Sequence, residues 1–139
     1  MQKGRLLNCL IPSPLESGNE PDGMVFVANY PETNFGVSYL ESALFLNVKH
    51  NEDEGIYCLS MPVSNDMTMI GGRETFGYPK KIGNILFEKQ GDDVRGWTER
   101  GGTRFLDISA KLTEKFNDEK AQSKIKERLL HCRQCEIFV

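Results

Sequence analysis

Apolar and polar residues alternate along much of this chain, which is the pattern of β-strands that bury one face. The clearest case is residues 103–112, where four apolar side chains share one face: Leu106, Ile108, Ala110 and Leu112. The polar residues between them, on the opposite face, are Asp107, Ser109 and Lys111. We therefore expect a strand there, and the glycines at 101 and 102 predict a hairpin with the strand before it.

The same pattern predicts a series of short strands separated by turns. Turns are expected at residues 31–36 and in the acidic segment 51–55. Residues 11–23 hold three prolines and two glycines, which is typical of a connector. The expected strands are residues 24–30, 37–48, 56–63, 80–89, 94–100 and 103–112, and a last strand starts at Glu136.

Residues 64–70 have the features of one short helix. Ser64 or Asn65 can serve as its N-cap, because both side chains accept hydrogen bonds from free backbone N–H groups of a first turn. The glycines at 71 and 72 follow directly and are expected to end the helix.

A longer helix is expected at residues 117–130, where Asn117 is the candidate N-cap. Its apolar residues recur every fourth position and so share one face: Ala121, Ile125 and Leu129. These elements together predict a mainly β domain with minor α content, in which the strands are antiparallel and one helix comes late.

The bulk composition narrows the classes of function. The chain has 139 residues, which suffices for one domain over 1–139 but hardly for two. Its formal net charge of -3 argues against a nucleic-acid or anionic-membrane surface, since both need a basic patch. No apolar run is long enough for a membrane span, and the N-terminus lacks the apolar core of a signal peptide. We therefore expect a cytoplasmic protein.

Cys132 and Cys135 form a CxxC pair, the spacing of some zinc and redox sites. A zinc site needs a second pair of ligands, and a redox CxxC usually opens a helix that follows a strand. Here the pair follows a helical pattern instead. We therefore expect reduced structural thiols and no metal at this position.

The segment GGRETFGYPKKIG, residues 71–83, places two adjacent lysines behind a rigid corner. Pro79 fixes its own backbone torsion and pushes Tyr78 into an extended conformation. If Lys80 and Lys81 continue as a strand, their side chains point to opposite faces, and only one can enter an apolar interior. A lysine must be neutral to attack a carbonyl, and burial favours the neutral form. The alternative is a solvated lysine pair at a strand start.

Glu41 lies in the expected strand 37–48, whose two faces are both apolar. One face carries Val37, Tyr39, Ala43 and Phe45 beside Glu41, and the other carries Leu40, Leu44, Leu46 and Val48. Such a strand is buried, and a buried carboxyl group has a raised pKa and can act as general acid or base. The alternatives are a glutamate at the mouth of the strand or one paired with an arginine such as Arg73.

The segment GRETFGYPKK, residues 72–81, resembles the signature of the acetoacetate decarboxylase family: Gly-Arg-Glu, a short spacer, then an aromatic residue and Pro-Lys-Lys. YLES at residues 39–42 is similar to the family's Tyr-x-Glu-Ser. LIPSPL at 10–15 resembles an early Pro-x-Pro-Leu segment, and residues 95–112 resemble the hairpin that follows the lysine strand in some members. The resemblance covers most of residues 10–112.

This resemblance implies a role for each matching residue. Lys80 corresponds to the family's Schiff-base lysine, Lys81 to the second lysine of its pair, and Glu41 to its active-site glutamate. Glu41 would assist proton transfer or orient the substrate. The residues expected to form apolar walls of the substrate site are Tyr78, Phe76 and Met61.

The resemblance also implies an architecture and a reaction. The fold would be a closed or partly open, cone-like antiparallel β-barrel that assembles into homo-oligomers and uses no metal or organic cofactor. The implied reaction is decarboxylation of a small 3-oxo acid through a lysine Schiff base and an enamine. The alternatives are aldol-dehydration chemistry on a 2-oxo acid, or an inactive barrel that binds a small ligand.

Two parts of the family pattern have no match in this chain. The family has an arginine near its N-terminus and a second acid in the strand that corresponds to residues 24–30, where this chain carries Phe26 and Val27. Family members are also longer. We therefore expect the chain to lack the N-terminal and C-terminal parts of the family's domain.

Overall fold

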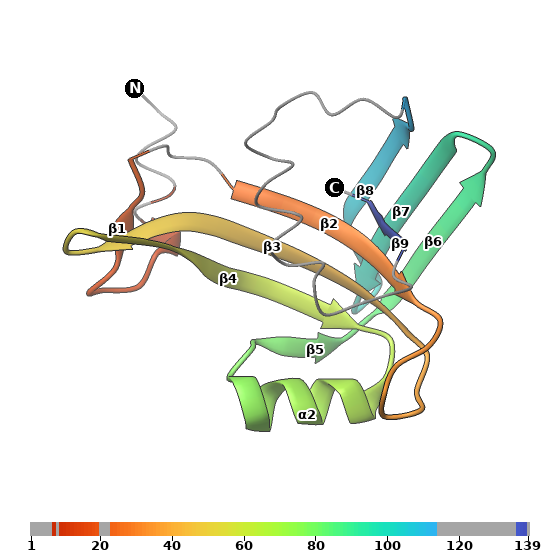
Figure 1. Cartoon of the computed structure of the whole chain (residues 1–139), viewed down its shortest axis with the longest axis horizontal. Coiled ribbons are helices and arrows are strands. Elements are labelled where there is room, and N and C mark those ends of the chain that lie inside the picture. The colour runs from red at the N-terminus through yellow and green to blue at the C-terminus, as the bar shows by residue number, and fades with distance from the viewer. Residues whose placement is uncertain (1–6, 8, 20–22, 114–135, 139) are drawn as a thin grey trace.

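The computed structural model describes residues 7, 9–19, 23–113 and 136–138, which form two β-sheets and the helix α2 (Figure 1). The larger sheet has the order β5-β4-β3-β2-β9, with β1 beside β3. Its strands are β1 (Glu16–Ser17), β2 (Gly23–Tyr30), β3 (Tyr39–His50), β4 (Asp53–Val63), β5 (Lys80–Ile82) and β9 (Glu136–Phe138). The smaller sheet consists of β6 (Asn84–Gln90), β7 (Asp93–Arg100) and β8 (Thr103–Lys111). The predicted mainly β class is confirmed.

The expected strand 80–89 is in fact divided between the two sheets at Gly83. Residues Lys80–Ile82 pair in parallel with β4, whereas Asn84–Gln90 pair antiparallel with β7. A Cβ at Gly83 would lie 3.3 Å from the Glu99 carbonyl oxygen and 3.4 Å from the Pro62 Cβ, so the chain crosses between the sheets through a narrow gap. The fully antiparallel expectation is therefore wrong for β5, because helix α2 connects β4 to β5 and lets the two strands run in the same direction.

The sequence predicted that the helix ends at the glycines 71 and 72. Helix α2 (Asp66–Phe76) instead continues through them. The Asn65 side chain accepts a hydrogen bond from the Thr68 N–H at 3.2 Å, which makes Asn65 the N-cap. Gly77, with a φ of 70°, provides the left-handed C-cap instead of Gly71 or Gly72. Two glycines within a helix cost roughly 1 kcal/mol each relative to alanine, so contacts outside the helix must compensate. The helix expected at 117–130 lies outside the described residues.

The larger sheet is buried on both faces around β2 and β3. On one face, the buried apolar residues of the first cluster are Phe26, Ala28, Ala43, Phe45 and Met61. On the other face, the smaller sheet packs closely: a Cβ at Gly96 would lie 2.8 Å from the Val27 Cβ. Thr98 and Ser42 meet at the same interface. The expectation that the strand containing Glu41 is buried on both faces is confirmed.

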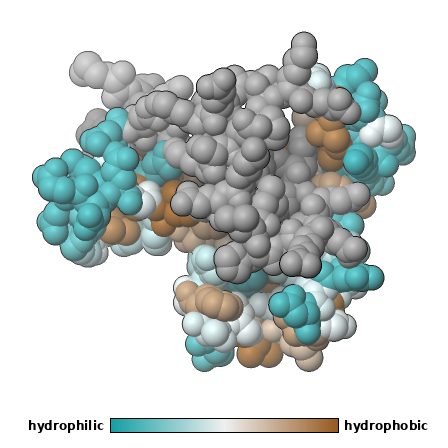
Figure 2. Space-filling model, viewed as in Figure 1, coloured by the Kyte–Doolittle hydropathy of each residue, from teal (hydrophilic) through white to brown (hydrophobic). Residues whose placement is uncertain are grey.

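The two sheets are not joined into a closed barrel within the described residues, so the barrel stays a prediction. Helix α2 lies outside the sheets, next to β5 (Figure 1). Figure 2 shows hydrophobic atoms at the surface over this helix, and its exposed apolar side chains include Met67, Ile70 and Phe76. Among the described residues, no helix has the length and apolar composition needed to cross a membrane.

The hydrogen bond between the sheets predicts a measurable coupling. Thr98 Oγ1 donates to Ser42 Oγ at 2.7 Å, and the two residues are 0% and 1% exposed. We expect Thr98→Val to lower the free energy of unfolding by about 1–3 kcal/mol, because it leaves a buried hydroxyl without this partner. Urea denaturation measures the change.

The control is the double variant Thr98→Val with Ser42→Ala, which removes both hydroxyls. Its loss should be smaller than the sum of the two single losses, because neither partner is left unpaired. Strictly additive losses would contradict a contribution of this hydrogen bond to the packing of the sheets.

Candidate active site

Lys80 and Glu41 form a buried ion pair, although 39 residues separate them in the sequence. Lys80 opens β5 beside Met61 of β4, and Glu41 lies on β3, one strand further into the sheet. Lys80 Nζ donates to Glu41 Oε2 at 2.5 Å, and the two side chains are 8% and 7% exposed. A lysine and a carboxylate that are nearly fully buried are uncommon unless they are paired in this way.

The turn between α2 and β5 brings Lys80 to this position. Gly77 takes up the left-handed conformation, and the Tyr78 N–H donates to the Gly72 carbonyl at 3.1 Å. Pro79 follows, and β5 starts at the next residue. Along β5, Lys80 is buried and Lys81 is exposed, in agreement with the expectation that the two lysines point to opposite faces.

Glu41 is buried and is paired with strands on both sides, with Ala28 on β2 and Val63 on β4, so it does not lie at an exposed end of the strand. Burial raises the pKa of the Glu41 carboxyl above its ordinary value, while the charge and the hydrogen bond of Lys80 oppose this rise. The alternative pairing with Arg73 is wrong, because Arg73 Nη1 instead donates to the backbone carbonyl of Lys80 at 3.2 Å. Arg73 therefore holds the β5 backbone in place, and Lys80 provides the counter-charge of Glu41.

Two stacked tyrosines, which were not among the predicted site residues, border the ion pair. Tyr39 and Tyr30 face each other across β3 and β2, with ring centroids 4.7 Å apart. Lys80 Nζ lies 5.6 Å from the centroid of the Tyr39 ring, within the range of a cation–π contact. Burial, and then the charge of Glu41, raise the pKa of both phenols, so the hydroxyl groups stay neutral at physiological pH. Tyr39 lies two residues before Glu41 and so shares its strand face, and this spacing is the sequence signal that could have identified Tyr39 as a site residue.

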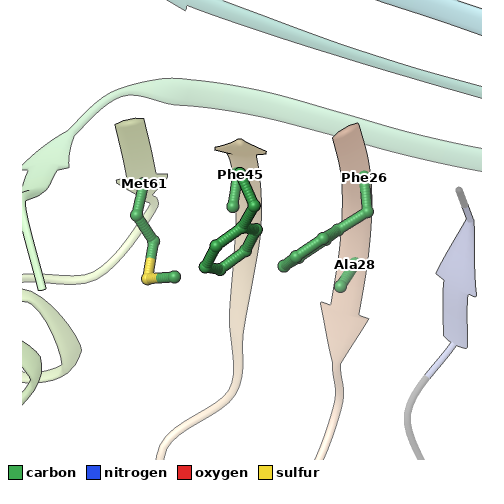
Figure 3. Close-up of a cluster of buried hydrophobic side chains, with 5 residues drawn as sticks. Phe26, Ala28, Phe45 and Met61 are labelled. Atoms are coloured by element: carbon green, nitrogen blue, oxygen red, sulfur yellow. The ribbon is translucent and has the colours of Figure 1, made fainter. Parts of the chain in front are cut away.

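The expected wall residues have different environments. Met61 is buried in the apolar cluster and pairs in register with Lys80. Figure 3 shows Met61, Phe45, Phe26 and Ala28 on neighbouring strands, with their side chains on one side of the sheet. Phe76, the last residue of α2, is 73% exposed and Tyr78 is 39% exposed, and their ring centroids lie 6.3 Å apart. Substrate binding by these three residues stays a prediction.

Within the described part of the chain, no group of three or more His, Cys, Asp or Glu side chains is arranged to hold a metal ion. Cys132 and Cys135 lie outside that part, so the interpretation of the CxxC pair is untested. The side chains that meet at the site provide an amine, a carboxyl group, two phenols and an apolar cluster.

Comparisons with known sequences identify one family. The sequence model of that family, acetoacetate decarboxylase (ADC), matches residues 3–136. An acetoacetate decarboxylase of Acidiphilium cryptum is 31% identical over 98 residues, and acetoacetate decarboxylase 3 of Mesorhizobium japonicum is 32% identical over 95 residues. These alignments cover 70% and 68% of this chain but 40% and 37% of the relatives. The chain therefore spans about 40% of the length of these relatives.

Solved structures share the fold of this chain. Acetoacetate decarboxylase from Legionella pneumophila aligns with a TM-score of 0.75 and 22% identity, over 88% of this chain and 49% of that one. The enduracididine biosynthesis enzyme MppR, complexed with pyruvate, aligns with a TM-score of 0.67 and 16% identity, over 85% and 54% of the two chains. At these identities the likeness shows a common fold and nothing further.

Proposed function

This chain belongs to the acetoacetate decarboxylase family, and from this membership we propose that it decarboxylates a small 3-oxo acid through a Schiff base on Lys80. The observation that carries the proposal is the buried contact of Lys80 Nζ with Glu41 Oε2 at 2.5 Å. In this contact an amine lies against a carboxyl group whose pKa is raised by burial.

The first step is a proton transfer within the pair. When the proton moves from the Lys80 ammonium group to the Glu41 carboxylate, both side chains become neutral and the amine gains a free lone pair. The apolar cluster next to the pair favours this neutral state, because two separate charges are costly to bury. The burial that raises the pKa of Glu41 supports its role as the proton acceptor.

The neutral amine then adds to the ketone carbon of the substrate. The Glu41 carboxyl group gives its proton to the hydroxyl group of this adduct, so that water leaves and an iminium ion forms. The bond to the carboxylate breaks, its electron pair moves toward the iminium nitrogen, and carbon dioxide leaves with formation of an enamine. A proton taken up from solvent through Glu41 adds to the enamine carbon, and hydrolysis of the resulting iminium ion releases the ketone and restores the Lys80 ammonium group. Tyr39, whose ring is 5.6 Å from Nζ, lies where it can stabilise the cationic iminium.

We expect the adduct to be trapped on one lysine. Wild-type protein is incubated with acetoacetate, reduced with borohydride and weighed intact, and peptide mapping locates the added mass. The adduct should form on Lys80 and be absent from Lys80→Ala. Lys89→Ala, which removes an exposed lysine from β6, is the matched control and should label like wild type.

Lys81→Ala measures the contribution of the second lysine, and we expect a far smaller loss than for Lys80→Ala. Its side chain is exposed, so solvent and salt screen its charge from the buried pair. Absence of an adduct from folded wild-type protein would contradict the proposed chemistry and favour the inactive ligand-binding barrel.

Product analysis separates the decarboxylase from the alternative chemistry on 2-oxo acids. Carbon dioxide and a ketone from acetoacetate support decarboxylation, whereas a condensation product from pyruvate and an aldehyde supports aldol-dehydration. Assembly into homo-oligomers and a cytoplasmic location belong to the same proposal, and sedimentation analysis and cell fractionation test them.

A further inference from the structure

Helix α2 contains two adjacent glycines with opposite surroundings. Gly71 is exposed, and a Cβ added there would have no atom within 4 Å. Gly72 is buried, and a Cβ added there would lie 2.5 Å from Lys80 Cδ, 2.5 Å from Lys80 Cε and 3.2 Å from Lys80 Nζ. The space that a side chain at residue 72 would fill is therefore occupied by the Lys80 side chain.

The contacts around Gly72 also attach the helix to the strand that carries the lysine. The Gly72 carbonyl accepts from the Tyr78 N–H at 3.1 Å, and the next residue, Arg73, donates to the Lys80 carbonyl at 3.2 Å. The backbone of Lys80 is thus fixed relative to the helix. Its side chain then runs past the bare backbone of Gly72 toward Glu41.

We infer that Gly72 is a positioning residue for Lys80: the missing side chain forms a slot that holds the lysine against Glu41. This inference rests on the proposed function only for its effect on the reaction. A lysine side chain has several rotatable bonds, and a defined position must be imposed from outside. The helix backbone lies on one side of the Lys80 methylene groups, and Glu41 binds their end.

A methyl group at residue 72 would overlap Cδ and Cε, and protein Cβ atoms essentially never lie within 3.0 Å of such atoms. Because the Lys80 backbone is held by Arg73 and by its pairing with β4, the side chain must rotate away. Rotation separates Nζ from Glu41 Oε2, and the proton transfer within the pair loses its geometry.

The first test compares Gly72→Ala with Gly71→Ala in the adduct-trapping reaction. We expect Gly72→Ala to slow adduct formation at least about tenfold, and Gly71→Ala to react at the wild-type rate. The two substitutions make the same chemical change at neighbouring positions of one helix. A wild-type rate for folded Gly72→Ala would overturn the inference.

The second test needs no activity and therefore separates this inference from the proposed function. Gly72→Ala is introduced into wild type and into a Lys80→Ala/Glu41→Leu background, which lacks both charges of the buried pair. In wild type, the substitution should lower Tm or prevent folding. In the background it should leave Tm unchanged or raise it, because alanine is the better helix former.

A difference of about 4 °C or more between the two backgrounds supports the slot. The slot is also supported if Gly72→Ala folds only in the background that lacks the lysine. Equal Tm changes in both backgrounds, or failure to fold in both, would show that residue 72 does not act through Lys80 and would overturn the inference. These outcomes stand even if wild-type protein forms no adduct with acetoacetate.

Discussion

Lys80→Met is expected to lower the free energy of unfolding by about 3–5 kcal/mol at pH 8, because it leaves a buried carboxylate without its partner. Glu41 is 6% exposed, and Lys80 is its ion-pair partner in the structure. Methionine fills nearly the same volume as the lysine stem, so the loss comes from charge more than from a cavity. Urea denaturation at a series of pH values measures it.

The loss depends on pH with a defined sign. The folded-state pKa of Glu41 is raised by burial, and removing Lys80 removes the interactions that oppose the rise. The folded state therefore binds a proton more tightly than the unfolded chain, whose Glu pKa is about 4.3. In the variant, the stability that protonated Glu41 contributes is fully present below a pH of about 4.3. It is lost as the pH rises through the folded-state pKa of Glu41. The variant should approach wild type near pH 4 and fall further behind as the pH rises toward 8.

The control is Lys80→Met combined with Glu41→Leu, which removes both charges. Replacing a buried ion pair by apolar residues of similar size is often neutral or stabilising by about 1–4 kcal/mol, so the double variant should recover the loss without forming any adduct. A loss that persists in the double variant, or that does not change with pH, would show that the uncompensated carboxylate is not its cause.

Glu41→Gln is expected to slow imine formation by about 10²- to 10⁴-fold at pH 7, the range for removal of a general acid–base group. Glutamine keeps the size and can still accept a hydrogen bond from Lys80, but it cannot take the lysine proton. Single-turnover trapping with acetoacetate and borohydride measures the rate. Glu88→Gln, at an exposed glutamate of β6, is the matched control and should react like wild type.

The pH profile distinguishes loss of the proton acceptor from general damage to the site. In Glu41→Gln, hydroxide must remove the lysine proton in place of Glu41, so the rate should rise as the medium becomes more alkaline. A rate within about twofold of wild type at pH 7 would exclude Glu41 as the acceptor. A large loss that is constant with pH would indicate misplacement of Lys80 instead.

The strands could be predicted from the sequence because their signal is local. Alternation with a period of two residues depends only on neighbouring side chains, and β2, β3, β4, β7 and β8 lie within a few residues of their expected positions. The opposite orientation of Lys80 and Lys81 follows from the same local geometry. The motif resemblance also selected Lys80 and Glu41, the two residues that meet in the structure.

The wrong predictions share a different cause. The glycines at 71 and 72 were expected to end a helix, but α2 continues because Gly72 packs against Lys80 and Gly77 supplies the C-cap. The strand expected at 80–89 is divided because Gly83 crosses between two sheets. A local preference of about 1 kcal/mol per residue is smaller than the energy of burying side chains between elements, so tertiary contacts override it.

The sequence by itself determined the class of the fold, the positions of most strands and the two residues of the candidate ion pair, since these depend on local periodicity and on a short motif. Only the tertiary structure decided that Glu41 meets Lys80 and not Arg73, and that Tyr39 lies beside Lys80 Nζ. It alone shows that Gly72 leaves room for the lysine. The physical reason is distance along the chain: partners 39 residues apart are chosen by how strands and helix pack, and no local pattern encodes that choice.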